Sequence, residues 1–338
     1  MNKLIFFGGA FYTFFVIYGL LLSLFYDGFT QFSGNSQIYF YIPFSFLCFV
    51  SLTLLSKEDE YPAAMFLFFY FSISTALIIF LGGMETNFPP HFIFSYSDSL
   101  YSQGITKFYM IGALVSLFLA MKSKKIFLII NLLAFVVFIS LSFLGSARGD
   151  FLFGIFVILV YLSFRYKSSF IMAFLFSLIL LINFVTMPSY SEEFLMLQRL
   201  QSVADGNLGT RDLLISNAIE LVYENPVCLL TGCGFNYFQV YHSYEFGLYP
   251  HNILIEYLIT FGLIITFLIF LLFYFGFSKA QKDKEMTFTP VLSCYLLLLS
   301  LKSGSIFEFL TLAIVSYYFS FGMCAISDRL NISKIKKS

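Results

Sequence analysis

The sequence predicts an all-α polytopic membrane protein with about ten transmembrane helices and one large helical loop outside the membrane. Of its 338 residues, 59% are hydrophobic and only 11% are charged, whereas soluble domains are roughly 25% charged. The mean hydropathy is +0.86. Apolar runs of about 20 residues, the length that crosses a bilayer core, recur along the chain. This composition excludes a disordered chain, a collagen, a small disulfide scaffold and a nucleic-acid-binding protein.

The predicted spans fall at ten apolar segments, residues 4–26, 38–55, 63–82, 105–121, 126–144, 151–164, 169–187, 251–277, 286–301 and 305–326. The first begins directly after Lys3, and it lacks a small-residue cleavage site, so we expect it to remain as an anchor. The spans define three parts of the chain: helices 1 to 7 in residues 1–187, an outer loop subdomain in residues 188–250, and helices 8 to 10 with a cytoplasmic tail in residues 251–338.

Basic residues predict the orientation of these spans. Of the 19 lysines and arginines, 14 fall in the connections on one side, together with both chain ends. Cytoplasmic loops are enriched in Lys and Arg, so this side is predicted to be cytoplasmic and both termini are predicted to lie inside. The outer set is Lys107, Arg148, Arg199, Arg211 and Lys302.

Three of the five arginines, Arg148, Arg199 and Arg211, therefore lie on the outer side, where orientation does not require them. A guanidinium binds carboxylate or phosphate oxygens with a planar fork and keeps its charge at all relevant pH values. Arginines in this position suggest an anionic ligand. The alternative is ordinary surface pairing with acidic residues of the outer loop.

The outer loop is predicted to contain two helices. One begins at Ser191-Glu192-Glu193, carries Arg199 in its middle and runs to about Asp205. The other is capped by Thr210 and runs to about Glu224, where Asn225-Pro226 ends it. Arg211 lies in the first turn of this second helix, where free amides and the helix dipole already favour an anion. Arg211 is therefore the stronger anion-binding candidate.

Two of the five cysteines, Cys228 and Cys233, fall on the outer side, where a disulfide between them is allowed. The other three lie in predicted spans. The default expectation for all five is that they act as small hydrophobic residues. A turn bracketed by Gly232 and Gly234 surrounds Cys233, and an aromatic stretch expected at the membrane interface follows it up to Tyr249.

Arg148 follows the small-residue run Gly145-Ser146-Ala147 between two spans. Counting 17 residues back from Arg165 at 1.5 Å of rise places it roughly 25 Å across a core about 30 Å thick. Ionisable groups at such depth usually face a cavity or a partner, and the flanking glycines permit a broken helix there. The alternative is a local pair with Asp150.

His251 and Asn252 open the eighth predicted span at the same outer level. The imidazole could accept a proton, donate a hydrogen bond to phosphate, or have no chemical role. Asn252 and Glu256 share a helix face at i and i+4, so they could form a structural pair. Mutual pairing is the simplest interpretation of Lys302 and Glu308 in the last hairpin. The sequence contains no metal-ligand motif and no phosphate-cradling glycine loop, so we expect neither a metal nor another cofactor.

Two stretches resemble the bacterial O-antigen polymerase and ligase superfamily, in which an Arg-led helix, an Asn-Pro, a GxG turn and a His-Asn occur in order, with an Arg earlier after small residues. The matching residues are Ser146-Ala147-Arg148-Gly149, Gly209-Thr210-Arg211-Asp212, Asn225-Pro226, Gly232-Cys233-Gly234, and Pro250-His251-Asn252 with Glu256 and Gly262. The resemblance covers about 120 residues, and the remainder is similar in hydropathy alone. An aromatic residue usual after the helix-leading Arg is absent, since Leu214 and Ile215 stand there.

The resemblance implies a membrane glycosyltransferase of the bacterial inner membrane. Such an enzyme takes a glycan from an undecaprenyl pyrophosphate carrier on the periplasmic face and passes it to an acceptor sugar hydroxyl. It implies His251 and Arg211 as catalytic residues, with His251 as the base and Glu256 as the alternative base. It also implies Arg148, Asn252 and Glu256 as substrate-binding residues, to which the charge pattern adds Arg199. The expected partners are the undecaprenyl-pyrophosphate-linked oligosaccharide, membrane lipid and a chain-length regulator protein, with no nucleic acid.

Within that superfamily the sequence favours a polymerase, which adds the growing chain to a new lipid-linked repeat unit. The chain is short for a ligase, which transfers the finished chain to lipid A core, and its Lys-rich, Phe-rich composition suits a polymerase. A lipid-linked oligosaccharide flippase is the alternative from another class. A flippase would hold its charges in a central cavity within the spans, whereas the charges here gather on one face.

Overall fold

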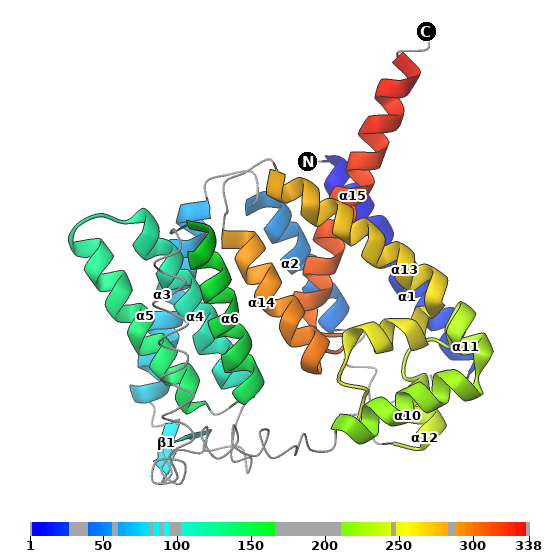
Figure 1. Cartoon of the computed structure of the whole chain (residues 1–338), viewed down its shortest axis with the longest axis horizontal. Coiled ribbons are helices and arrows are strands. Elements are labelled where there is room, and N and C mark those ends of the chain that lie inside the picture. Colours follow the sequence, from blue (N-terminus) through cyan, green and yellow to red (C-terminus); the bar gives the residue numbers. More distant parts are fainter. Residues whose placement is uncertain are drawn as a thin grey trace. The chain divides into compact units, whose positions relative to one another are not determined.

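The structure is a computed structural model, and the elements of the described residues are helices apart from one short hairpin (Figure 1). It describes residues 2–26, 40–55, 60–80, 84–87, 91–94, 103–145, 147–165, 211–244, 248–282 and 288–335. The helices that match predicted spans are α1 (Asn2–Phe25), α2 (Ile42–Leu55), α3 (Glu60–Phe80), α4 (Gln103–Lys122), α5 (Ile126–Leu144), α6 (Arg148–Arg165), α13 (Ile253–Lys282), α14 (Phe288–Ser303) and α15 (Phe309–Ile335). The predicted all-α polytopic membrane fold is confirmed.

Six of these helices are long and apolar enough to cross a membrane, and α2 and α14 are shorter apolar helices. The helix α6 is also apolar, but Arg148, Asp150 and Arg165 lie on it. The segment 169–187 lies outside the described residues, so the total of ten spans stays a prediction. The remaining helices are α10 (Arg211–Glu224), α11 (Pro226–Thr231) and α12 (Tyr237–His242).

The chain forms two compact units, residues 59–208 and residues 1–58 with 209–338. In the first unit, α4 packs against α3, α5 and α6. Its buried side chains include Tyr109 and Met110, and Met110 packs directly over Gly154 of α6. An antiparallel hairpin of β1 (Met84–Asn87) and β2 (His91–Phe94) belongs to the same unit.

In the second unit, α13 packs along α15, and α15 also contacts α1 and α2. Small residues permit the α13–α15 contact, because a Cβ at Gly276 or Gly322 would collide with a carbonyl of the facing helix. At one end of this unit, Lys3 Nζ lies 3.0 Å from Asp328 Oδ1, and Lys279 Nζ lies 4.0 Å from Asp328 Oδ2. The start of α1 and the last turns of α13 and α15 thus share one end, with the 211–244 segment beyond the other end of α1.

The helix α13 is broken at Gly262, although the sequence predicts one continuous span over residues 251–277. Gly262 has φ 75° and ψ 171°, a conformation that side-chain-bearing residues rarely adopt. A Cβ there would also collide with the Leu230 carbonyl. The break interrupts the helical hydrogen bonds and leaves carbonyls that need other donors.

Candidate functional site

The turn around Cys233 supplies the donors that the break in α13 requires. The Cys233 amide donates to the Ile259 carbonyl at 2.7 Å, and the Gly234 amide donates to the Thr260 carbonyl at 3.1 Å. Gly232 has φ 82°, and its backbone passes so close to α13 that a Cβ would collide with the Thr260 carbonyl. The Gly-Cys-Gly turn is therefore a structural plug that docks into the broken helix.

A disulfide between Cys228 and Cys233 closes the plug, with the two Cα atoms 5.0 Å apart. The default expectation that all five cysteines act as small hydrophobic residues is wrong for this pair. The free cysteines Cys48, Cys294 and Cys324 are half-buried. The disulfide joins α11 covalently to the turn, and the hydrogen bonds of the turn hold both against the α13 break.

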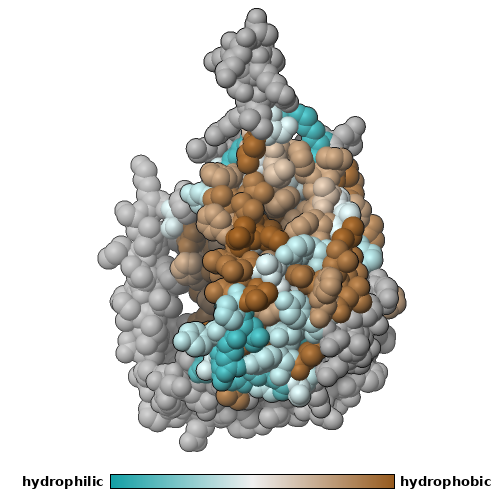
Figure 2. Space-filling view, turned by 90° about the vertical axis from the view of Figure 1, so that its right-hand side faces the viewer, coloured by the Kyte–Doolittle hydropathy of each residue, from teal (hydrophilic) through white to brown (hydrophobic). Residues whose placement is uncertain are grey.

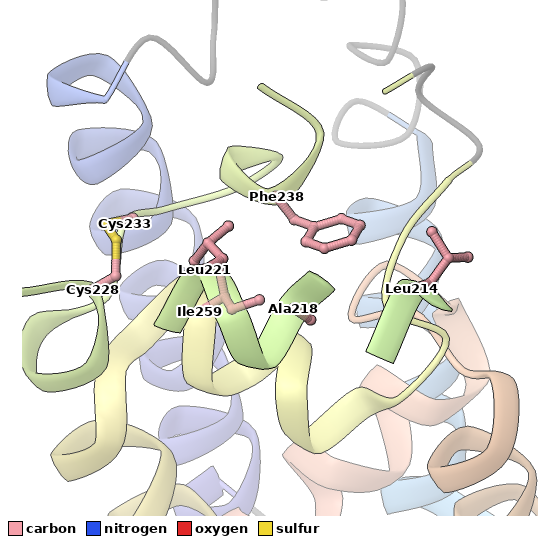
Figure 3. Close-up of a cluster of buried hydrophobic side chains, with 7 residues drawn as sticks. All are labelled: Leu214, Ala218, Leu221, Cys228, Cys233, Phe238 and Ile259. Atoms are coloured by element: carbon pink, nitrogen blue, oxygen red, sulfur yellow. A yellow bond between two sulfur atoms is a disulfide. The ribbon is translucent and has the colours of Figure 1, made fainter. Parts of the chain in front are cut away.

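A compact apolar cluster fixes α10 above the same break (Figure 3). Its members come from α10, α11, the turn, α12 and α13, and they are Leu214, Ala218, Leu221, Cys228, Cys233, Phe238 and Ile259. The predicted helix to Glu224 is confirmed; its predicted cap Thr210 lies outside the described residues. Pro226 then opens α11, where a missing amide hydrogen has no cost. The cluster sets the position of Arg211, the first residue of α10.

Arg211 is a half-buried cation at a helix N-terminus. Within the described part of the chain, no carboxylate lies within 4.0 Å of its guanidinium. Its neighbour Asp212 is exposed. The guanidinium is close enough to His251 and Tyr249 to act on both electrostatically. The site therefore has one fixed positive charge and a positive helix end, which together suit an anion.

His251 lies in the connection before α13, with φ 53° in the left-handed region. Its ring centroid is 4.0 Å from that of Tyr249, whose hydroxyl donates to the Ser303 carbonyl at 3.1 Å. Burial, together with the Arg211 cation, lowers the pKa of His251 to about 4, so the imidazole is neutral at pH 7. Its Nδ1 is buried without a hydrogen-bond partner among the described residues. A neutral imidazole with an unpaired nitrogen can accept a proton.

Asn252 caps α13. Its Oδ1 accepts hydrogen bonds from the Leu254 and Ile255 amides at 3.0 and 3.2 Å, and its Nδ2 donates to the Leu301 carbonyl at 2.8 Å. All of these bonds are internal to the protein. The side chain therefore holds the start of α13 against the end of α14. The sequence predicted a structural role for Asn252, but with Glu256 as its partner.

Glu256 is buried and holds the loop between α14 and α15. Its Oε2 accepts a hydrogen bond from the Ile306 amide at 2.5 Å, and Ser305 Oγ donates to its Oε1 at 3.5 Å. The predicted pair of Asn252 with Glu256 does not form, because both side chains bind the α14–α15 region instead. Glu256 lies close enough to Tyr249 to act on it electrostatically. Both carboxylate oxygens are engaged, so Glu256 is less available than His251 as a base.

Arg148 opens α6 in the other unit. The start of α6 is anchored on α4: the Ala147 amide donates to Thr106 Oγ1 at 3.1 Å, and Gly145 packs against the same threonine. The glycines around Arg148 permit a broken helix, but α6 is one helix from Arg148 to Arg165. The broken helix among the described residues is α13, at Gly262. Arg199 and its predicted helix lie outside the described residues. A shared anion site for the three arginines stays a prediction.

Tyr249 and the 301–306 backbone were missed by the sequence interpretation. Tyr249 precedes Pro250-His251, and its position in an aromatic stretch suggested only an interfacial role. The contribution of Leu301, Ser303 and Ile306 depends on backbone atoms, for which residue types give no signal. Across the described residues, no three His, Cys, Asp or Glu side chains are grouped to hold a metal ion.

Residues 133–271 match the family model of O-antigen ligase. The matched region contains Arg148, Arg211, the plug, His251 and Glu256. The match supports the superfamily of membrane glycosyltransferase-like polymerases and ligases, and it does not distinguish between these two branches. No curated protein and no solved structure matches the chain.

Proposed function

We propose that this chain is an O-antigen polymerase of the bacterial inner membrane. It transfers the growing glycan from undecaprenyl pyrophosphate to a new lipid-linked repeat unit on the periplasmic face. The observation that carries the proposal is the proximity of Arg211, at a helix N-terminus, to a neutral His251 whose Nδ1 has no hydrogen-bond partner among the described residues. One group suits a pyrophosphate, and the other suits a sugar hydroxyl.

In the proposed reaction, Arg211 acts on the pyrophosphate and His251 acts on the acceptor hydroxyl. The pyrophosphate of the donor binds the Arg211 guanidinium and the first amides of α10. An imidazole nitrogen of His251 takes the proton of the acceptor hydroxyl, whose oxygen forms a bond to the anomeric carbon of the growing glycan. The bond from that carbon to the pyrophosphate oxygen breaks, and undecaprenyl pyrophosphate leaves. Arg211 offsets the negative charge that accumulates on this leaving group.

Two further observations support a periplasmic site. A disulfide persists in an oxidising compartment, and the Cys228–Cys233 bond lies beside α10 and α13 in the same structural unit. Lys3 and Lys279 lie at one end of this unit, and the Thr231 carbonyl binds Tyr18 near the other end of α1. Because basic residues favour the cytoplasmic side, the plug and the site then face the periplasm.

A ligase is the second candidate, because the matched family model carries that description. The two differ in the acceptor. A polymerase uses a lipid-linked repeat unit, whereas a ligase uses lipid A core.

A deletion strain tests the proposal and separates the two candidates. Loss of a polymerase leaves lipopolysaccharide that carries a single repeat unit and removes long chains. Loss of a ligase removes single repeat units and long chains alike from lipid A core, and it leaves lipid-linked polymer in the membrane. Complementation with His251→Ala at equal protein level should reproduce the deletion pattern. Unchanged long-chain lipopolysaccharide in the deletion strain would contradict both assignments.

A further inference from the structure

A continuous series of aromatic rings, here the aromatic ladder, lies on the outer subdomain. Its members are Tyr26 after α1, Tyr237, Tyr241 and His242 on α12, and Tyr244 after α12. Successive ring centroids are 5.3, 6.0, 4.9 and 5.3 Å apart. The reaction chemistry proposed above uses none of these rings.

The aromatic ladder follows α10 toward Arg211. Tyr241 donates a hydrogen bond to the Glu224 carboxylate at the C-terminus of α10. Further along, His242 Nε2 lies 3.1 Å from the Asn217 carbonyl, and Asn217 Nδ2 donates to the Tyr244 hydroxyl. From Asn217 to Arg211 is six residues, or about 9 Å along the helix axis. The rings therefore lead from the far end of α10 toward the proposed reaction centre.

The charge on this surface does not suit a lipid headgroup. Residues 211–244 contain Asp212, Glu220 and Glu224 but no lysine, and their single arginine, Arg211, lies at the site. Surfaces that bind anionic lipid are rich in Lys and Arg. Tyrosines of an interfacial belt place their polar ends at the headgroup level, whereas the Tyr241 hydroxyl here is bonded to Glu224. Figure 2 shows hydrophilic residues gathered over the lower part of this face, below a hydrophobic region.

Partly exposed aromatic rings beside a carboxylate suit a neutral partner rich in hydroxyl groups. Tyr241 is 37% exposed, and the other rings of the aromatic ladder are half-buried. The face of an aromatic ring is electron-rich, so it attracts the C–H groups of a sugar ring. A carboxylate such as Glu224 accepts hydrogen bonds from sugar hydroxyls.

We propose that the aromatic ladder, with Asn217 and Glu224, binds the growing glycan and holds it beside the reaction centre between successive transfers. This inference rests on the proposed polymerase function, which supplies a chain long enough to extend away from Arg211. A glycan held in this way is extended again before it dissociates, so the aromatic ladder controls product length more than it controls the first transfer.

The test compares the chain-length distribution of lipopolysaccharide in a deletion strain complemented with ladder variants. Tyr241→Ala should shift the most abundant length to shorter chains while short polymers still form. Tyr241→Phe keeps the ring and should stay close to wild type. Tyr223→Ala is the matched control, because Tyr223 is also on the outer subdomain and is 85% exposed, but lies outside the ladder. Membrane levels of each variant are measured, and Glu224→Gln provides a second variant that preserves packing.

Direct binding gives an independent readout. The probe is the polysaccharide released by mild acid from lipopolysaccharide of the same strain, added to the purified full-length protein in detergent. Tyr241→Ala should weaken binding roughly tenfold, which corresponds to about 1.4 kcal/mol. Wild-type chain lengths and wild-type binding in Tyr241→Ala and Glu224→Gln would overturn this inference alone. Failure of the wild-type gene to restore long chains would instead overturn the polymerase function.

Discussion

The starts of α6 and α10 have similar sequences but different surroundings. Each helix begins with an arginine and has an aspartate within two residues, Arg148 with Asp150 and Arg211 with Asp212. Asp150 is buried and interacts electrostatically with Lys107 of α4, and the backbone just before α6 bonds to Thr106. Asp212 is exposed, and Arg211 faces His251 and Tyr249.

This difference shows that a helix-leading arginine indicates an anion site only when its surroundings leave its charge available. At α6, Asp150 already interacts with Lys107, and the start of the helix is packed on α4. At α10, the neighbouring titratable groups are the half-buried, neutral imidazole of His251 and the Tyr249 hydroxyl. We therefore expect substitution of Arg211 to reduce activity more than substitution of Arg148. The following experiments measure that difference.

The largest effect is expected at His251. His251→Ala removes the proposed base, whose contribution to such a reaction is typically 10²- to 10⁴-fold, so long-chain product should disappear. His251→Gln should retain some product if the side chain only donates a hydrogen bond. The measurement is polymer formation by purified protein from a lipid-linked repeat unit. Glu256→Gln serves as the comparison and should keep activity, since a Gln oxygen can still accept from the Ile306 amide. Full activity in His251→Ala with an inactive Glu256→Gln would transfer the role of base to Glu256.

The second effect is expected at Arg211. An ammonium cannot form the bidentate contacts of a guanidinium, so Arg211→Lys should lower the rate by about 10²-fold, as expected for loss of one oriented donor to a leaving group. Arg148→Lys should have a smaller effect, because the start of α6 is packed on α4 and Asp150 lies in the same first turn. Arg199→Lys completes the set. Wild-type chain length in all three variants, at normal protein level, would count against a pyrophosphate site.

The third effect concerns the plug that holds α10 and α13 together. Replacing both Cys228 and Cys233 with serine should lower the free energy of unfolding by about 2 kcal/mol, the value expected for a short disulfide loop. Cys294→Ser is the control, because Cys294 is a free, half-buried cysteine. Thermal unfolding in detergent measures both. Equal midpoints for the double variant and the wild type would show that the hydrogen bonds of the turn suffice.

Most of the helices were predictable because an apolar segment in a membrane must satisfy its own backbone hydrogen bonds, and a helix does so. Nine of the ten predicted segments contain helices, and the tenth lies outside the described residues. The break at Gly262 was not predictable, because a glycine within an apolar run is common in membrane helices. What identifies the break is the turn from Gly232 to Gly234 that fills it, and this contact joins residues about 30 positions apart.

The candidate site was predictable in its residue types and less so in its contacts. Arg211 and His251 were identified by charge position and by resemblance, and the structure brings them together. Burial and the Arg211 cation lower the pKa of His251, and both causes depend on tertiary packing. The family resemblance, which depends on the order of motifs in the sequence, implied that Asn252 and Glu256 bind substrate. Their bonds to Leu301 and Ile306 depend on tertiary packing, which sequence order does not reveal.

The fourth effect is a displaced pH profile. The base must be unprotonated, so activity should fall only as the pH drops through about 4, the lowered pKa of His251. An imidazole with the ordinary pKa of about 6.5 would be only about 3% neutral at pH 5. Activity at pH 5 close to that at pH 7 is therefore expected in the purified wild-type protein. Arg211→Gln removes the cation that faces His251, and it should move the acid limb of the residual activity to higher pH. An acid limb near pH 6.5 in the wild type would contradict the lowered pKa of the half-buried His251.

The smallest effect is expected at Asn252, and it separates a structural role from substrate binding. Asn252→Ala removes the cap of α13 and the bond to the Leu301 carbonyl, which should lower stability by about 1 kcal/mol. Asn252→Asp can still accept from the Leu254 and Ile255 amides, but it loses the donor and places a negative charge beside the Leu301 carbonyl. Both variants should therefore form long chains when their membrane levels match the wild type, and both should unfold at lower temperature. If Asn252 binds substrate instead, the rate at saturating protein level will fall in both variants while their unfolding temperatures remain near the wild-type value. That outcome would make the cap secondary and place Asn252 beside His251 and Arg211 in the reaction.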